Sequence, residues 1–170
     1  MNAMLRDVYR PWGDAECLDV FTHYAAMEQL KTRKPAVLYI AYGETDEWAH
    51  SGRYRSYLDA AHQVDAWIKE IWEWVQRNPQ YRNKTALFIS TDHGRGDKKK
   101  QEWTSHGSNI EGASQIWFAA MGPGITARGE IKTPRQLFQE QFAQSIANLL
   151  GVTYTAKHPI AEPIKELMLK

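Results

Sequence analysis

The chain has 170 residues, of which 43% are apolar, and a formal net charge of +1. This length suits one domain with a real core, and the balanced charge argues against nucleic-acid binding by bulk attraction. A single cysteine, Cys17, excludes an internal disulfide, and no stretch approaches the ~20 apolar residues of a membrane span. No signal peptide is visible, so we expect a periplasmic or exported protein only if a segment upstream of this chain carries one.

The first part of the sequence predicts a helix followed by a buried strand. Residues 1–13 look irregular, and Asp14 can cap a helix that runs to about Lys31. After Pro35, the nearly all-apolar run 36–43 predicts a strand buried on both faces, as in a parallel sheet. One face of the helix is predicted to consist of Cys17, Phe21, Tyr24 and Ala25.

The strongest helical pattern covers residues 54–75, where apolar side chains recur at three- and four-residue spacing until Pro79 ends it. The run 86–92 predicts a second buried strand. Strand, helix and strand then form a βαβ unit, which predicts parallel strands and a right-handed crossover. A third strand is predicted over 115–122.

The C-terminal part predicts two more helices. The sequence Thr133-Pro134-Arg135-Gln136 is a capping box with proline at the first helical position. The helix is predicted to run to Leu150 with Gly151 as its C-cap, and a short helix follows Pro163. The predicted fold class is therefore α/β, a mostly parallel sheet sandwiched by helices. We expect residues 1–170 to be a single domain that is incomplete at its N-terminal side.

Five residues in three short stretches carry the chemistry. They are Asp46 and His50 in TDEWAHSG, Asp92 and His93 in STDHGRG, and His106 in SHGS. Each stretch alone arises often by chance as a turn, a cap or a loop. Their joint occurrence after two predicted strands favours a ligand site, because such sites lie at the carboxyl ends of parallel strands.

These stretches resemble the alkaline phosphatase superfamily, which includes phosphodiesterases, cofactor-independent phosphoglycerate mutases and sulfatases. The resemblance covers roughly residues 36–152, and it extends to the segment ending in MGPGI and to the helix QEQFAQSIANLLGV. It implies the α/β sandwich of that superfamily. One departure is Ala49, where many relatives have glycine.

The resemblance also implies a ligand set. Asp46, His50 and His106 would hold one metal ion, and Asp92 and His93 would hold a second. A further Asp and the Ser or Thr nucleophile would come from an earlier strand that we do not find in residues 1–35. We therefore expect the C-terminal portion of a larger metallohydrolase domain, with no catalytic nucleophile of its own and little activity alone.

The ligand chemistry favours Zn²⁺ or Mn²⁺, because imidazole nitrogen suits these ions better than Ca²⁺ or Mg²⁺. The histidines thus argue against a calcium site of the sulfatase type. Arg95 either contacts a substrate phosphate or is a structural arginine. Trp48 and Trp103 are candidates for the wall of the site.

The predicted function is a metal-dependent phosphoric ester hydrolase, either a phosphomonoesterase or a phosphodiesterase, acting on a phosphorylated small molecule. The alternatives are a phosphomutase of the phosphoglycerate mutase type and a non-catalytic metal-binding module. We also expect the isolated chain to self-associate or to bind its missing N-terminal half. Trp67 and Trp74 either belong to that contact surface or pack in the core.

Overall fold

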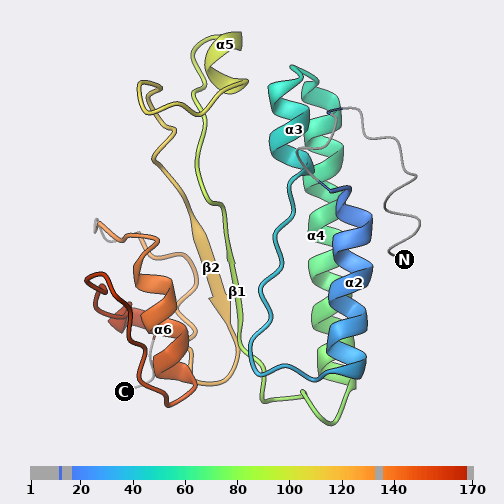
Figure 1. Ribbon diagram of the computed structural model, residues 1–170, viewed down its shortest axis with the longest axis vertical. Helices are drawn as coiled ribbons and strands as arrows, with labels where there is room; N and C mark the ends of the chain where they lie inside the picture. Colours follow the sequence, from blue (N-terminus) through green and yellow to red (C-terminus); the bar gives the residue numbers. More distant parts are fainter. Residues whose placement is uncertain (1–11, 13–16, 133–135, 168–170) are drawn as a thin grey trace. The chain divides into compact units, whose positions relative to one another are not determined.

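The computed structural model describes residue 12, residues 17–132 and residues 136–167 (Figure 1). The chain divides into two compact units, Met1–Arg77 with Gly94–Gln115, and Asn78–His93 with Ile116–Lys170. The first unit contains α2 (Asp19–Thr32), α3 (Glu44–His50), α4 (Tyr54–Arg77) and α5 (Lys100–Trp103). The second contains β1 (Leu87–Ser90), β2 (Phe118–Met121), α6 (Gln141–Leu149) and the 3₁₀ turn η1 (Lys165–Leu167). The single-domain organisation stays a prediction.

Helix α4 follows the sequence prediction closely, beginning at Tyr54 and ending at Arg77, two residues before Pro79. Its inward face buries Ile71 and Val75. Helix α2 runs beside α4 (Figure 1), and the two meet where the His23 ring stacks on Trp67 at 5.0 Å between ring centres. Trp67, which is half-buried, therefore has ring partners within the first unit, and its part in a contact surface stays a prediction.

The prediction for α2 is wrong about which face of the helix is buried and about where the helix begins. Its buried side chains are Asp19, His23, Ala26, Met27 and Leu30. Tyr24, from the predicted face, is 55% exposed. Apolar spacing misplaces this face because two of its buried residues are polar. The helix begins after Leu18, and Asp14 lies outside the described residues.

The predicted strand over 36–43 is also wrong, because this segment forms no β-ladder among the residues that the structure describes. Val37 is 54% and Tyr39 86% exposed, while Leu38 and Ile40 are half-buried. An apolar run becomes a strand only when a neighbouring backbone pairs with it. Its last residues lead directly into α3, a helix that the sequence analysis did not predict.

The sheet in the described part of the chain has two strands, and they are antiparallel, with Leu87 opposite Met121 and Ser90 opposite Phe118. The predicted strands over 86–92 and 115–122 are thus present in shorter form. The parallel sheet sandwiched by helices, with its βαβ unit, is not confirmed. Here the chain returns through α5 and its loops and runs beside β1 in the opposite direction.

Helix α6 begins at Gln141, later than predicted, and residues 133–135 of the predicted capping box lie outside the described part. Its C-terminal end follows the prediction. Gly151 has φ +66°, and the N–H groups of Gly151 and Val152 donate to the carbonyls of Asn148 and Ala147 at 3.0 Å. This is a Schellman cap, which favours glycine at that position.

The C-terminal segment is fastened to α6 by buried polar groups. Ser145 Oγ accepts the Ile164 N–H at 2.9 Å, and Gln141 Nε2 donates to the Glu162 carbonyl at 3.0 Å. Ile164 is 1% exposed. The short helix expected after Pro163 is the turn η1. None of the described helices is long and apolar enough to cross a membrane.

Candidate metal centre

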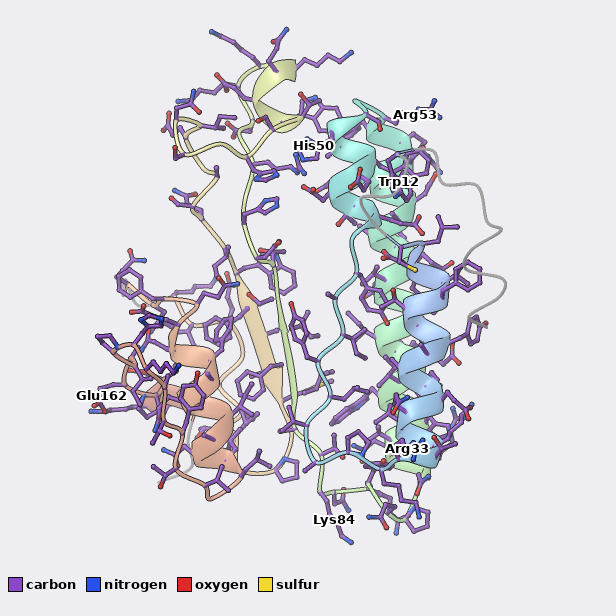
Figure 2. All side chains as sticks on the ribbon, in the orientation of Figure 1. Trp12, Arg33, His50, Arg53, Lys84 and Glu162 are labelled. Carbon is purple, nitrogen blue, oxygen red and sulfur yellow. The ribbon has the colours of Figure 1, made fainter. Side chains whose placement is uncertain are left out.

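The first two predicted ligands lie on α3 rather than just past a strand. Asp46 and His50 are four residues apart, so one helical turn brings them to the same face. The His50 Nε2 atom is 3.2 Å from Asp46 Oδ2. Figure 2 labels His50, which is the last residue of α3.

Asp19 of α2 fixes where α3 begins. Its Oδ1 and Oδ2 atoms accept the N–H groups of Gly43 at 2.8 Å and Glu44 at 3.2 Å. In return, Glu44 Oε1 accepts the Asp19 N–H at 2.8 Å. A carboxylate at a helix N-terminus satisfies N–H groups that lack partners within the helix. Asp19 therefore sets the start of the helix that carries Asp46 and His50.

The sequence analysis missed both Asp19 and α3. A signal for the helix was available, because Glu44, Asp46 and Glu47 all fall in its first turn, where acidic residues are favoured. The role of Asp19 had no local signal, because its acceptors and the N–H groups they cap are 24 and 25 residues apart.

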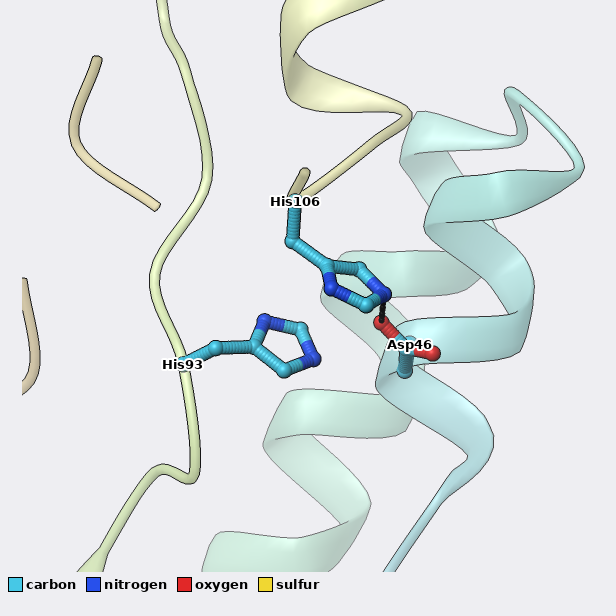
Figure 3. A group of neighbouring side chains, drawn as sticks. All are labelled: Asp46, His93 and His106. Carbon is cyan, nitrogen blue, oxygen red and sulfur yellow. Dashed lines mark ion pairs between the residues drawn. The ribbon is translucent and has the colours of Figure 1, made fainter. Parts of the chain in front are cut away.

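His106 joins this pair from the segment that follows α5. Its Nε2 atom is 3.1 Å from His50 Nε2 and 3.7 Å from Asp46 Oδ1. Figure 3 shows the ion pair between Asp46 and His106 as a dashed line. We call Asp46, His50 and His106 the ligand cluster. Their side chains are 33%, 41% and 35% exposed, so the cluster is open to solvent.

Arg95 lies against the same carboxylate. Its Nη2 atom donates to Asp46 Oδ1 in a short contact and to the Asp46 carbonyl at 3.3 Å. Its Nη1 atom donates to the Trp103 carbonyl at 3.1 Å. The Arg95 side chain is only 13% exposed, and burial lowers the pKa of its guanidinium. Arginine still keeps its proton at neutral pH, because its ordinary pKa lies far higher.

Asp92 and His93 follow β1 and belong to the second unit. Asp92 is 80% exposed, and its Oδ1 accepts the His93 N–H at 3.0 Å. His93, also drawn in Figure 3, is the last residue of that unit and is joined to Gly94 of the first. Within one unit, the structure thus brings together Asp46, His50 and His106. The ligand roles of all five residues stay predictions.

The two tryptophans expected to wall the site have ring partners nearby. Trp103 meets Tyr54 edge-on at 5.4 Å between ring centres. Trp48 meets Trp12 edge-on at 5.0 Å, and Arg53 lies over its ring at 5.7 Å. Ala49, the departure noted in the sequence, is fully buried beside Trp48.

The donor set of the ligand cluster fits a divalent cation. Asp46 and His106 each offer an atom suited to metal binding, and His50 adds a second imidazole nitrogen within hydrogen-bond distance of both. One carboxylate and two imidazoles leave room for water or substrate, as in catalytic zinc sites. Two nitrogens and an oxygen suit Zn²⁺ or Mn²⁺ better than the hard cations.

Comparison with known protein families agrees with this chemistry. The model of the Metalloenzyme superfamily matches residues 17–153, which include every predicted ligand. This superfamily is α/β, mostly enzymatic and metal-dependent, and it covers alkaline phosphatase-like and phosphoglycerate mutase-like proteins. No curated protein sequence and no solved structure matches the chain.

Proposed function

The chain belongs to the Metalloenzyme superfamily, and on that premise we propose that it supplies metal ligands to a two-metal phosphoric ester hydrolase. The observation that carries the proposal is the meeting of Asp46, His50 and His106. The two histidine Nε2 atoms lie 3.1 Å apart although the residues are 56 positions apart in the chain. The substrate class is a phosphorylated small molecule, cleaved as a monoester or a diester.

In this proposal each of the five predicted ligands has a defined role. Asp46, His50 and His106 hold one cation, and Asp92 and His93 hold the other. Two bound cations would neutralise the charge of a phosphate ester and clamp its attacking and leaving oxygens. The carboxylates of Asp46 and Asp92 reduce the net charge of the cation pair. The imidazoles favour Zn²⁺ or Mn²⁺ over Mg²⁺.

We further propose that the chain alone turns over little substrate, because the sequence prediction assigns the nucleophile and one metal-binding Asp to residues outside it. Removing a nucleophile from a covalent mechanism costs several orders of magnitude in rate. A phosphomutase of the phosphoglycerate mutase type is the second candidate, since the superfamily covers that class. A non-catalytic metal-binding module is the third, and it would bind metal equally well.

Calorimetry on the chelator-stripped chain tests the metal site. We expect about one equivalent of Zn²⁺, bound more tightly than Mg²⁺, because the ligand cluster offers three protein ligands whereas the proposed second site has two in the described part of the chain. A chain that binds no Zn²⁺, or prefers Mg²⁺, contradicts the proposal.

Hydrolysis of p-nitrophenyl phosphate monoesters and diesters with Zn²⁺ or Mn²⁺ tests the proposal that the chain alone turns over little substrate. The isolated chain should show turnover close to background. Robust turnover that survives repeated purification and disappears in Asp92→Ala would show that the chain carries its own nucleophile. Mutase activity on a phosphorylated sugar acid would favour the second candidate.

A further inference from the structure

Arg95 connects the two segments that carry the ligand cluster. Through Nη2 it holds the carboxylate and the carbonyl of Asp46, at the start of α3. Through Nη1 it holds the carbonyl of Trp103, at the end of α5 and three residues before His106. One largely shielded guanidinium thus links the helix of Asp46 and His50 to the segment of His106.

The backbone on both sides of Arg95 is closely confined. The Gly94 N–H donates to the Ala113 carbonyl at 2.8 Å, and a Cβ at Gly94 would lie 2.3 Å from the carbonyl oxygens of Gly112 and Gln115. Neither oxygen belongs to a flexible side chain, so any larger residue at Gly94 forces the backbone to move.

Gly96 is confined in the same way on the other side. A Cβ there would lie 2.6 Å from Glu102 Cβ and 2.8 Å from Ile110 Cγ2. The Gly96 N–H also donates to the Glu102 carbonyl at 3.3 Å. The two glycines that flank Arg95 let this loop pack tightly, and the packing holds the Arg95 backbone in place beside α3.

We propose that Arg95 is a positioning residue for the metal site. It occupies Oδ1 of Asp46 while Oδ2 faces His50 Nε2 at 3.2 Å, and it sets the distance between α3 and the His106 segment. The inference rests on the proposed metal-binding function. Of the two alternatives that the sequence left open for Arg95, it develops the structural one, because the guanidinium is directed at protein oxygens rather than at a substrate phosphate.

Two electrostatic effects of Arg95 oppose each other. Its charge repels a cation bound at the cluster, but the cluster is about one-third exposed, and solvent screens that repulsion. A hydrogen bond that orients a ligating carboxylate typically raises metal affinity 10–100-fold. We therefore expect the orienting effect to dominate.

Lysine cannot replace this arginine. The planar guanidinium presents several N–H donors in fixed directions, so Arg95 reaches Asp46 and Trp103 at once. A lysine ammonium keeps the positive charge but lacks the planar set of N–H donors in fixed directions. The Arg95→Lys variant therefore separates a positioning role, which needs the geometry, from a purely electrostatic role, which needs only the charge.

Zinc titration of chelator-stripped Arg95→Ala and Arg95→Lys chains tests the inference, with Arg55→Ala as the charge-matched control. Arg55 lies on α4, is 88% exposed and pairs with Asp59. We expect the zinc Kd to rise about 10–100-fold in Arg95→Ala and nearly as much in Arg95→Lys, with no change in Arg55→Ala. The visible absorption of bound Co²⁺, which reports ligand geometry, should change in both Arg95 variants.

The outcomes separate this inference from the proposed function. A wild-type chain that binds no zinc overturns the proposed function and this inference with it. Zinc binding in the wild type that stays equally tight, or becomes tighter, in Arg95→Ala overturns the inference alone. Full retention of affinity by Arg95→Lys also overturns it. If Arg95→Ala does not fold, as judged by far-UV circular dichroism, the Arg95→Lys titration and its Co²⁺ spectrum decide.

Discussion

Two groups of polar side chains lie in the first unit, and they differ in the exposure of their central residues. The ligand cluster of Asp46, His50 and His106 is 33–41% exposed. The second group, which we call the buried network, consists of the buried Asp19 and His23 with their partners, the half-buried Tyr42 and Glu70, whose side chain is 49% exposed. Within it, Asp19 is 2% and His23 0% exposed.

Each polar side chain of the buried network contacts another protein group, although His23 Nε2 makes no hydrogen bond. His23 lies between the Tyr42 hydroxyl, 3.1 Å from Nδ1, and the Glu70 carboxylate, 3.3 Å from Nε2. Asp19 accepts backbone N–H groups of α3. Most polar groups removed from water are paired with protein groups in this way. The network therefore holds α2, α4 and the start of α3 together, whereas the open ligand cluster is accessible to an ion.

The two groups should differ most in their effect on zinc binding. We expect His50→Ala or His106→Ala to weaken zinc binding roughly 100-fold or more, since losing a ligand exceeds the 10–100-fold loss of an outer partner. Calorimetry measures it, and His62→Ala, an exposed histidine on α4, is the control. Unchanged zinc affinity in either variant would show that the substituted histidine is not a zinc ligand.

Substitution of Asp19 should lower the stability of the fold rather than the affinity for zinc. In Asp19→Ala the N–H groups of Gly43 and Glu44 lose their acceptors, and we expect the free energy of unfolding to fall by about 2–3 kcal/mol. Asp19→Asn, which keeps one side-chain oxygen, should lose less. Urea unfolding gives both values. Zinc stoichiometry should remain that of the wild type, and a loss of binding without a loss of stability would break the distinction between the two groups.

Gly94 supports the ligand cluster through packing. Gly94→Ala places a methyl group where carbonyl oxygens lie 2.3 Å away, and we expect it to cost about 1–3 kcal/mol of stability, as overpacking does. Gly129→Ala is the comparison, because its Cβ would meet no atom within 4 Å and only its φ of +63° opposes the change. Equal decreases in melting temperature for the two variants would mean that the backbone around Arg95 moves to accommodate the methyl group at little cost.

The smallest effect concerns alkaline pH. Burial, with the nearby charges of Asp19 and Glu70, raises the pKa of Tyr42 from 10.0 to about 12. The folded state thus favours the protonated phenol. The contribution of the Tyr42 phenol to the free energy of unfolding is complete below pH 10, its pKa in the unfolded chain. This contribution is lost as the pH rises toward 12.

Urea unfolding between pH 9 and pH 12 tests this prediction. Tyr42→Phe should lose less stability over that interval than the wild type, because it has no proton to release. Tyr39→Phe, at an 86% exposed tyrosine, should follow the wild type. Identical pH profiles for Tyr42→Phe and the wild type would show that the Tyr42 hydroxyl does not resist ionisation in the fold.

Much of the candidate site was predictable from the sequence, because its signals are local or are shared by a family. The superfamily was identified from three short stretches, and the family comparison confirms it. The grouping of Asp46, His50 and His106 was implied by the resemblance. Arg95 was noted, but its partners were not, since they lie 8 and 49 residues away in the chain.

Features that rest on local backbone hydrogen bonding were predictable from the sequence. These are the long helix α4, with its stop before Pro79, and the glycine cap after α6. Tertiary structure decided the rest. It left 36–43 outside any described sheet, paired β1 with β2 antiparallel, and brought Asp19 to the start of α3. The physical reason is that a helix supplies its own backbone partners, whereas a strand, a buried carboxylate and a guanidinium acquire theirs from distant parts of the chain.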